Sequence, residues 1–118
     1  MAPLDFDTTL SSDGDALIEL TGELDLSGAP ALDDEIDRLA SRGGVRRVVL
    51  DLRGLEFLDS SGLRSVALAE RRLEGAGRGL VLVRGKETVQ RVFEITRLEE
   101  RLTFVDSPDA LDGDGSGR

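Results

Sequence analysis

The chain has 118 residues, of which 39% are hydrophobic and 33% are charged, and its formal net charge is −9. This length fits one domain with a core large enough to fold without disulfides. The acidic balance argues against binding to nucleic acid or to anionic membrane surfaces, because both attract basic patches. It permits a basic protein partner.

The residue types that most often carry enzyme chemistry are missing. There is no His to act as a general base and no Cys to act as a nucleophile or metal ligand. Gly85-Lys86 does not form a phosphate-binding loop, because Glu87 follows where Ser or Thr is needed and Leu80 stands where the first Gly belongs. We therefore predict no catalytic residue, no cofactor, no metal site and no enzyme activity.

The first part of the chain predicts two strands and a helix. Residues 6–10 and 16–22 have the composition of strands, and Asp13-Gly14 between them is typical of a hairpin turn. Ser27 is positioned to cap a helix, which Gly43-Gly44 ends. The apolar residues of this helix recur at helical spacing: Leu32, Ile36, Leu39 and Ala40.

The second part alternates strands and helices. Residues 46–52 are β-branched and apolar, which predicts a central strand, and a short loop is expected over 53–58. Further strands are predicted at 80–83 and 103–105, and helices over 61–73 and 87–98. This alternation favours an α/β fold with a mixed β-sheet and parallel crossovers.

The domain is expected to span residues 1–106, followed by an acidic, Gly-rich, disordered tail over 107–118. No apolar run approaches the roughly 18 residues needed to cross a bilayer. The first residues carry neither the basic nor the apolar region of a signal peptide. We therefore expect a cytoplasmic protein.

The stretch from Asp59 to Leu63, Asp-Ser-Ser-Gly-Leu, opens the second predicted helix. One interpretation is a helix cap, in which a Ser oxygen accepts a backbone N–H hydrogen bond worth about 1 kcal/mol. The other is a phosphorylation site, since the start of a helix tolerates a phosphate that brings about −1.5 to −2 charge. The residues alone leave both open.

A second cluster, Thr21-Gly22-Glu23-Leu24-Asp25, ends the second predicted strand. In a sheet of this order, that strand end can lie beside the end of the central strand. Asp25 would then approach Ser60. The alternative is an ordinary strand-to-helix turn, which favours Gly and Asp for conformational reasons.

These two clusters, with Val48-Val49-Leu50-Asp51-Leu52 between them, resemble the bacterial anti-sigma factor antagonists of the STAS domain family. The resemblance covers about residues 4–105. It implies a STAS-like mixed β-sheet of four to five strands, with three to four helices packed mainly on one face.

The resemblance also implies a function. The unphosphorylated antagonist would bind an anti-sigma factor that is also a serine/threonine kinase, and so release a sigma factor. The kinase would phosphorylate the first Ser of the motif, Ser60, and a protein phosphatase would reset it. The partner-binding residues implied are Asp25, Asp59, Ser60, Ser61, Gly62, Leu63 and Arg64.

Arg64 departs from the small residue often found at its position, which bears on partner identity. The alternative function is a STAS scaffold subunit of a sensory or lipid-transport complex without phosphorylation.

Overall fold

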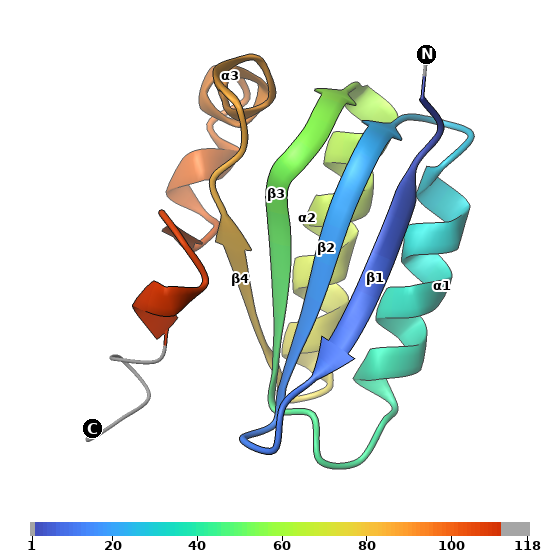
Figure 1. Cartoon of the computed structure of the whole chain (residues 1–118), viewed down its shortest axis with the longest axis vertical. Coiled ribbons are helices and arrows are strands. Elements are labelled where there is room, and N and C mark those ends of the chain that lie inside the picture. Colours follow the sequence, from blue (N-terminus) through green and yellow to red (C-terminus); the bar gives the residue numbers. More distant parts are fainter. Residues whose placement is uncertain (1, 112–118) are drawn as a thin grey trace.

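The computed structural model describes residues 2–111, which form a five-stranded sheet in the order β1-β2-β3-β4-β5 (Figure 1). The strands are β1 (Asp5–Leu10), β2 (Asp15–Leu24), β3 (Arg47–Leu58), β4 (Gly79–Val83) and β5 (Phe104–Val105). The helices are α1 (Ala29–Ala40), α2 (Ser60–Gly75), α3 (Glu87–Ile95) and the short 3-10 helix η1 (Leu98–Glu100). Among the strands of residues 2–111, only β1 runs antiparallel to its neighbour, so the predicted mixed α/β sheet is confirmed.

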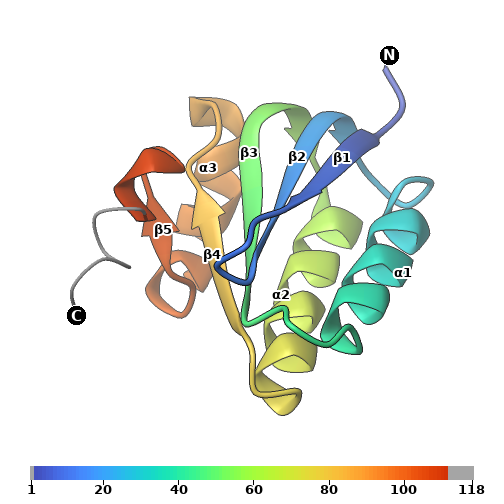
Figure 2. The same ribbon diagram turned by 60° about the horizontal axis from the view of Figure 1, so that its bottom comes forward.

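The main core lies between the sheet and its helices. Figure 2 shows α1 and α2 side by side against one face of the sheet. Alternate residues of β2 and β3 point into this layer, where they meet buried side chains of α1, α2 and α3. The residues from the two central strands are Ala16, Ile18, Leu20, Leu24, Val48, Leu50, Leu52, Leu55 and Leu58. The expected arrangement of helices on one face is therefore present.

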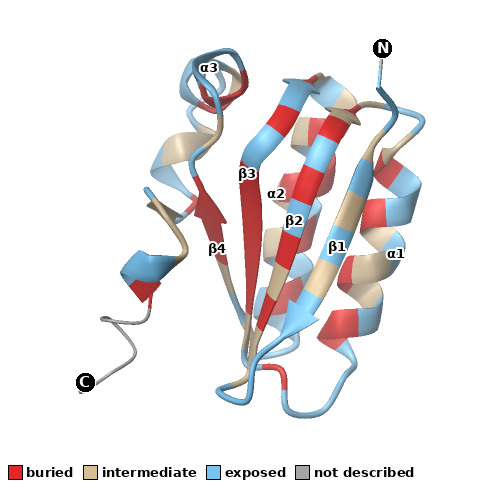
Figure 3. Ribbon diagram, in the orientation of Figure 1, coloured by how far each residue is buried: buried red, intermediate tan, exposed pale blue. Residues whose placement is uncertain are grey.

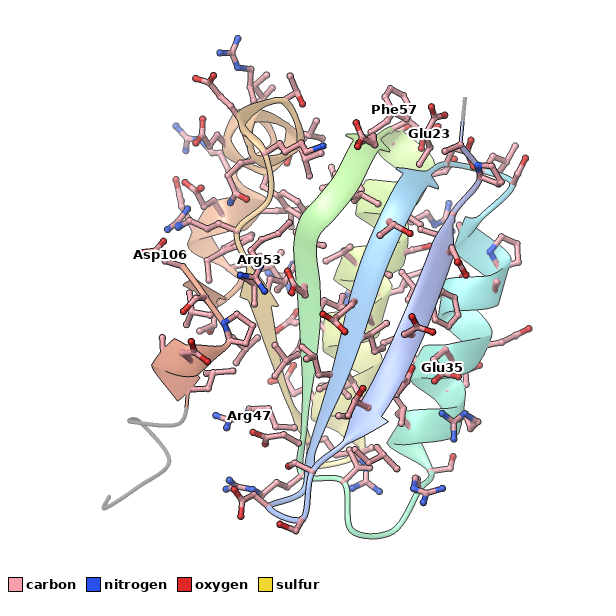
Figure 4. All side chains as sticks on the ribbon, in the orientation of Figure 1. Glu23, Glu35, Arg47, Arg53, Phe57 and Asp106 are labelled. Carbon is pink, nitrogen blue, oxygen red and sulfur yellow. The ribbon has the colours of Figure 1, made fainter. Side chains whose placement is uncertain are left out.

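The opposite face of the sheet carries a smaller apolar cluster beside an acidic, largely exposed area over β1 and β2 (Figure 3). Val49, Val81 and Val83 are buried there against Leu111. Beside them the buried Asp51 forms an ion pair at 2.8 Å with Arg53, the residue labelled in Figure 4. Residues 107–111, which the sequence assigned to the tail, thus reach the sheet, and residues 112–118 lie outside the described part of the chain.

Strand β3 is longer than the sequence predicts. The loop expected over 53–58 is wrong, because these residues continue the strand to Leu58 and pair with the end of β2. Gly22 permits this pairing across two irregularities in register: it has φ +84°, and a Cβ there would lie 2.1 Å from the carbonyl oxygen of Pro3. The sequence does not predict this second half of β3, because most of residues 53–57 are exposed and interrupt the apolar pattern.

The starts and ends of two helices also differ from expectation. The prediction that Ser27 caps α1 is wrong, because the N-cap of this helix is Gly28. The third helix ends at Ile95 rather than near residue 98, because Arg97 adopts a left-handed conformation with φ +65° and starts η1. Neither change affects the layer arrangement.

Candidate functional site

The candidate site lies where β2 and β3 end and α2 begins. Leu24 and Leu58 are paired at the ends of the two strands, and the backbone N–H of Asp59 donates to the carbonyl of Leu24 at 3.3 Å. The first turn of α2 packs directly onto this pair at Gly62. A Cβ at Gly62 would lie 2.4 Å from the Leu24 oxygen, so only glycine lets the helix begin this close to the sheet.

Asp59 caps α2. Its carboxylate accepts hydrogen bonds from the backbone N–H groups of Ser61 at 2.9 Å and Gly62 at 3.1 Å. The interpretation in which a Ser oxygen caps this helix is therefore wrong, because the preceding Asp performs that role. Ser60 is the first residue of the helix, its side chain is exposed, and within residues 2–111 its hydroxyl makes no hydrogen bond.

Ser61 lies differently from Ser60. It is half-buried and lines a surface depression of about 260 Å³ between the first turns of α1 and α2. Leu26, Arg64 and Leu68 line the same depression. The two adjacent serines are thus distinguished by exposure, and Ser60 is the more exposed to solvent.

Asp25 lies at the same end of the sheet, directly after Leu24. Its carboxylate accepts hydrogen bonds from the backbone N–H groups of Ser27 at 3.1 Å and Gly28 at 3.0 Å, and so holds the turn into α1. Within the described chain it makes no hydrogen bond to Ser60. The strand-to-helix turn interpretation therefore describes its contacts, while its position brings a negative charge to this end of the sheet.

The predicted partner-binding residues divide into two groups by exposure. Ser60 and Arg64 are exposed and available to a partner. The others position the loop and helix: Asp25 and Asp59 through their caps, Gly62 and Leu63 through packing on the core, and Ser61 within the depression.

The sequence analysis missed three exposed apolar side chains, two near the ends of β2 and β3 and one in the middle of α2. Leu26 is 74% exposed, Phe57 45% and Leu68 44%. Phe57 is paired with Glu23 where β3 and β2 end, as Figure 4 shows, and Leu26 and Leu68 line the depression. One signal was present: Leu68 falls outside the apolar stripe of α2, which indicates a leucine that faces solvent.

Acidic side chains surround these apolar groups. Glu23, Asp25 and Asp59 lie at the strand ends, and Asp33 lies on α1 across the depression from Arg64. Arg71 and Arg72 line a second depression on the other side of Leu68. Residues 2–111 hold no cluster of three or more side chains suited to a metal ion. In the same part of the chain, no helix has the length and apolar character needed to cross a membrane.

Comparison with known proteins decides the family. Residues 8–106 match the family described as Mlab, STAS domain. The chain belongs to the STAS domain family. The resemblance seen in the sequence is thereby confirmed.

Several relatives of this STAS domain are named anti-sigma factor antagonists. The anti-sigma-F factor antagonist RsfB of Mycobacterium tuberculosis is 30% identical over 112 residues, covering 94% of this chain and 90% of the relative. The anti-sigma F factor antagonist of Lysinibacillus sphaericus is 29% identical over 96 residues, covering 81% of this chain and 82% of that protein.

A solved structure of the anti-sigma factor antagonist SpoIIAA, in its unphosphorylated form, superposes with a TM-score of 0.81 over 97% of this chain and 99% of that chain, at 24% identity. The fold of this STAS domain is therefore that of SpoIIAA. SpoIIAA of Bacillus has also been solved in its phosphorylated form, with a TM-score of 0.72, 25% identity, and coverage of 92% of this chain and 97% of that chain.

Proposed function

We propose that this STAS domain is an anti-sigma factor antagonist whose affinity for an anti-sigma factor kinase is controlled by phosphorylation of Ser60. The observation that carries the proposal is the hydroxyl of Ser60, exposed at the first residue of α2 while Asp59 caps the helix in its place. The names of the relatives and the existence of a phosphorylated SpoIIAA structure support it.

The docking surface would combine apolar contact with charge. Leu26 follows β2, Phe57 lies near the end of β3 and Leu68 lies on α2, so each is an exposed apolar side chain on an element next to Ser60 that a partner could cover. The acidic groups around them favour a partner with a basic patch, since complementary charge speeds association. We expect Leu26→Ala and Leu68→Ala to weaken binding without unfolding the domain, because both side chains are largely outside the core.

Phosphorylation would change this surface by charge. The Ser60 oxygen would attack the γ-phosphorus of ATP held by the kinase, with loss of the hydroxyl proton and departure of ADP. The product carries about −1.5 to −2 charge at neutral pH. At a contact with about 4 Å separation, each repulsive pair of unit charges costs about 1 kcal/mol in water and about 4 kcal/mol at a partly dry surface. The switch therefore requires the partner to place a carboxylate opposite Ser60, while its basic groups face the acidic side chains around that contact.

The proposed cycle takes place in the cytoplasm, where the kinase finds ATP and the released sigma factor finds RNA polymerase. A protein phosphatase would remove the phosphate and restore binding. The domain itself supplies the acceptor hydroxyl and the docking surface, and the nucleotide chemistry belongs to the kinase.

The experiment is a phosphorylation assay with the cognate anti-sigma factor kinase, Mg²⁺ and ATP, followed by mapping of the phosphate by mass spectrometry. We expect the label on Ser60, loss of the label in Ser60→Ala, and retention of it in the matched control Ser61→Ala. Stable binding to the kinase with no label on either serine would contradict the switch. That result would favour the alternative of a STAS scaffold that binds partners without phosphorylation.

A further inference from the structure

Arg64 stands one helical turn after the acceptor serine. Residues four apart on a helix are neighbours, with about 5–6 Å between their Cβ atoms. Both side chains are exposed, and long side chains in helices lean back toward the N-terminus. This spacing puts a phosphate on Ser60 within reach of the Arg64 guanidinium, which in this structure lines the depression beside Ser61. An anion followed by a cation four residues later is the favourable order for an ion pair on a helix.

Arg64 has no competing partner in the described part of the chain. Most other cations there are engaged: Arg38, Arg47, Arg53, Arg72, Arg84, Lys86, Arg91 and Arg101 form ion pairs, and Arg46 and Arg78 donate to backbone carbonyls. Across residues 2–111, Arg64 makes neither an ion pair nor a hydrogen bond. Its guanidinium can therefore turn to a new anion without breaking an existing contact.

The nearby carboxylates are committed or lie on another element. Asp59 accepts the two backbone hydrogen bonds that cap α2, and Asp25 holds the turn into α1. Asp33, on α1, lines the same depression as Arg64 without forming an ion pair with it. A phosphate on Ser60 would offer three acceptor oxygens and nearly twice the charge of any of these carboxylates.

We infer that Arg64 is the intramolecular counter-ion of a phosphate on Ser60, an inference that rests on the proposed phosphorylation of this residue. The guanidinium is suited to this role because its fork of N–H donors matches phosphate oxygens. Phosphorylation then alters the docking surface twice: it adds a dianion, and it removes from the partner's reach the cation beside it.

The test uses the full chain with phosphoserine installed at position 60 during synthesis, so that it does not depend on any kinase. The pKa of the phosphate is read by ³¹P NMR titration at low salt. We expect Arg64→Gln to raise the phosphate pKa by about 0.15–0.4 of a pH unit, which is the strength of a close helical ion pair converted to pKa. Arg64→Lys should retain most of the effect, and about 1 M salt should remove it.

Arg71→Gln is the matched control. Arg71 is an exposed arginine of the same helix that makes no ion pair or hydrogen bond within residues 2–111, and it lies three turns, about 16 Å along the axis, beyond Ser60. The Arg71→Gln substitution should leave the phosphate pKa unchanged. Equal phosphate pKa values in the parent and Arg64→Gln, or an equal shift in Arg71→Gln, would overturn the inference.

The two proposals fail separately. The phosphate pKa could respond to Arg64 while the partner binds the phosphorylated and unmodified forms equally. That pair of results would support the ion pair and contradict the proposed switch. Loss of partner binding on phosphorylation, with a phosphate pKa that does not change in Arg64→Gln, would support the switch and contradict the ion pair.

Discussion

The position of the Ser60 hydroxyl is determined by the residue before it. Asp59 takes the capping hydrogen bonds from Ser61 and Gly62, and this leaves Ser60 exposed at the start of α2. A carboxylate in this place also interacts favourably with the positive end of the helix dipole.

Replacement of the cap gives the first prediction. Asp59→Ala should lower the free energy of unfolding by about 1 kcal/mol, because two backbone N–H groups lose their acceptor. Asp59→Asn, which keeps a capping oxygen, should stay within a few tenths of a kcal/mol of the parent. Urea denaturation measures both. An equal loss in the two variants would assign the effect to the charge of Asp59 rather than to its hydrogen bonds.

At the scale of elements, the contact between α2 and the sheet depends on a missing side chain. Alanine normally stabilises a helix relative to glycine by about 1 kcal/mol. At Gly62 we expect the opposite, a loss of about 1–3 kcal/mol in Gly62→Ala, because the new Cβ would meet the Leu24 oxygen at 2.4 Å. Gly75→Ala is the control: it lies in the same helix with nothing within 4 Å, and should be neutral or stabilising.

The contact between α1 and β1 includes a carboxylate, Glu35, whose contribution to stability should depend on pH. Thr8 Oγ1 donates to the Glu35 carboxylate at 2.6 Å, and Arg38 donates to it at 2.6 and 2.9 Å. The hydrogen bond from Arg38, assisted by that from Thr8, lowers the pKa of Glu35 below its ordinary 4.5 and outweighs the opposing effect of burial.

Because the folded-state pKa is the lower one, Glu35 stabilises the fold fully above about pH 4.5, and this contribution is lost as the pH falls through the lowered pKa. Glu35→Gln should therefore cost about 1 kcal/mol at pH 7. The difference from the parent should shrink as the pH falls from 5 to 3. Urea denaturation midpoints of both proteins across this pH range measure the difference. A difference that grows toward acid pH would contradict a lowered pKa of Glu35.

At the scale of the whole molecule, the sheet has two faces with different covers. The helices cover one face, and on the other Leu111 closes a small cluster with Val49, Val81 and Val83. The domain boundary expected at residue 106 can therefore be tested. Leu111→Ala should lower the free energy of unfolding by about 2 kcal/mol, as for a buried leucine at the edge of a core. Ala110→Ser, at an exposed neighbour, should not. No effect of Leu111→Ala would support an end at 106.

Much of this architecture was predictable because local signals agreed with the fold. Apolar periodicity identified the strands and helices, and Asp13-Gly14 and Gly43-Gly44 marked the turns. What failed depended on tertiary contacts. The second half of β3 is specified by its pairing with β2, and the choice of Asp59 over a serine as cap is specified by how the helix enters from that strand.

The site was predictable in part for the same reason. Its motif is local, so Ser60 and its helix could be found from the sequence. The exposed Leu26 and Phe57 could not, because a leucine or phenylalanine near a strand end is equally compatible with burial, and only the assembled sheet leaves them in solvent.

The most direct test of the account is the affinity of the cognate anti-sigma factor for the unmodified protein and for the protein carrying phosphoserine at position 60, measured by calorimetry in one buffer. We predict that the phosphate weakens binding at least tenfold, about 1.4 kcal/mol, that Ser60→Asp weakens it less, and that Ser60→Ala binds like the parent. Equal affinity of the unmodified and phosphorylated proteins would contradict the account.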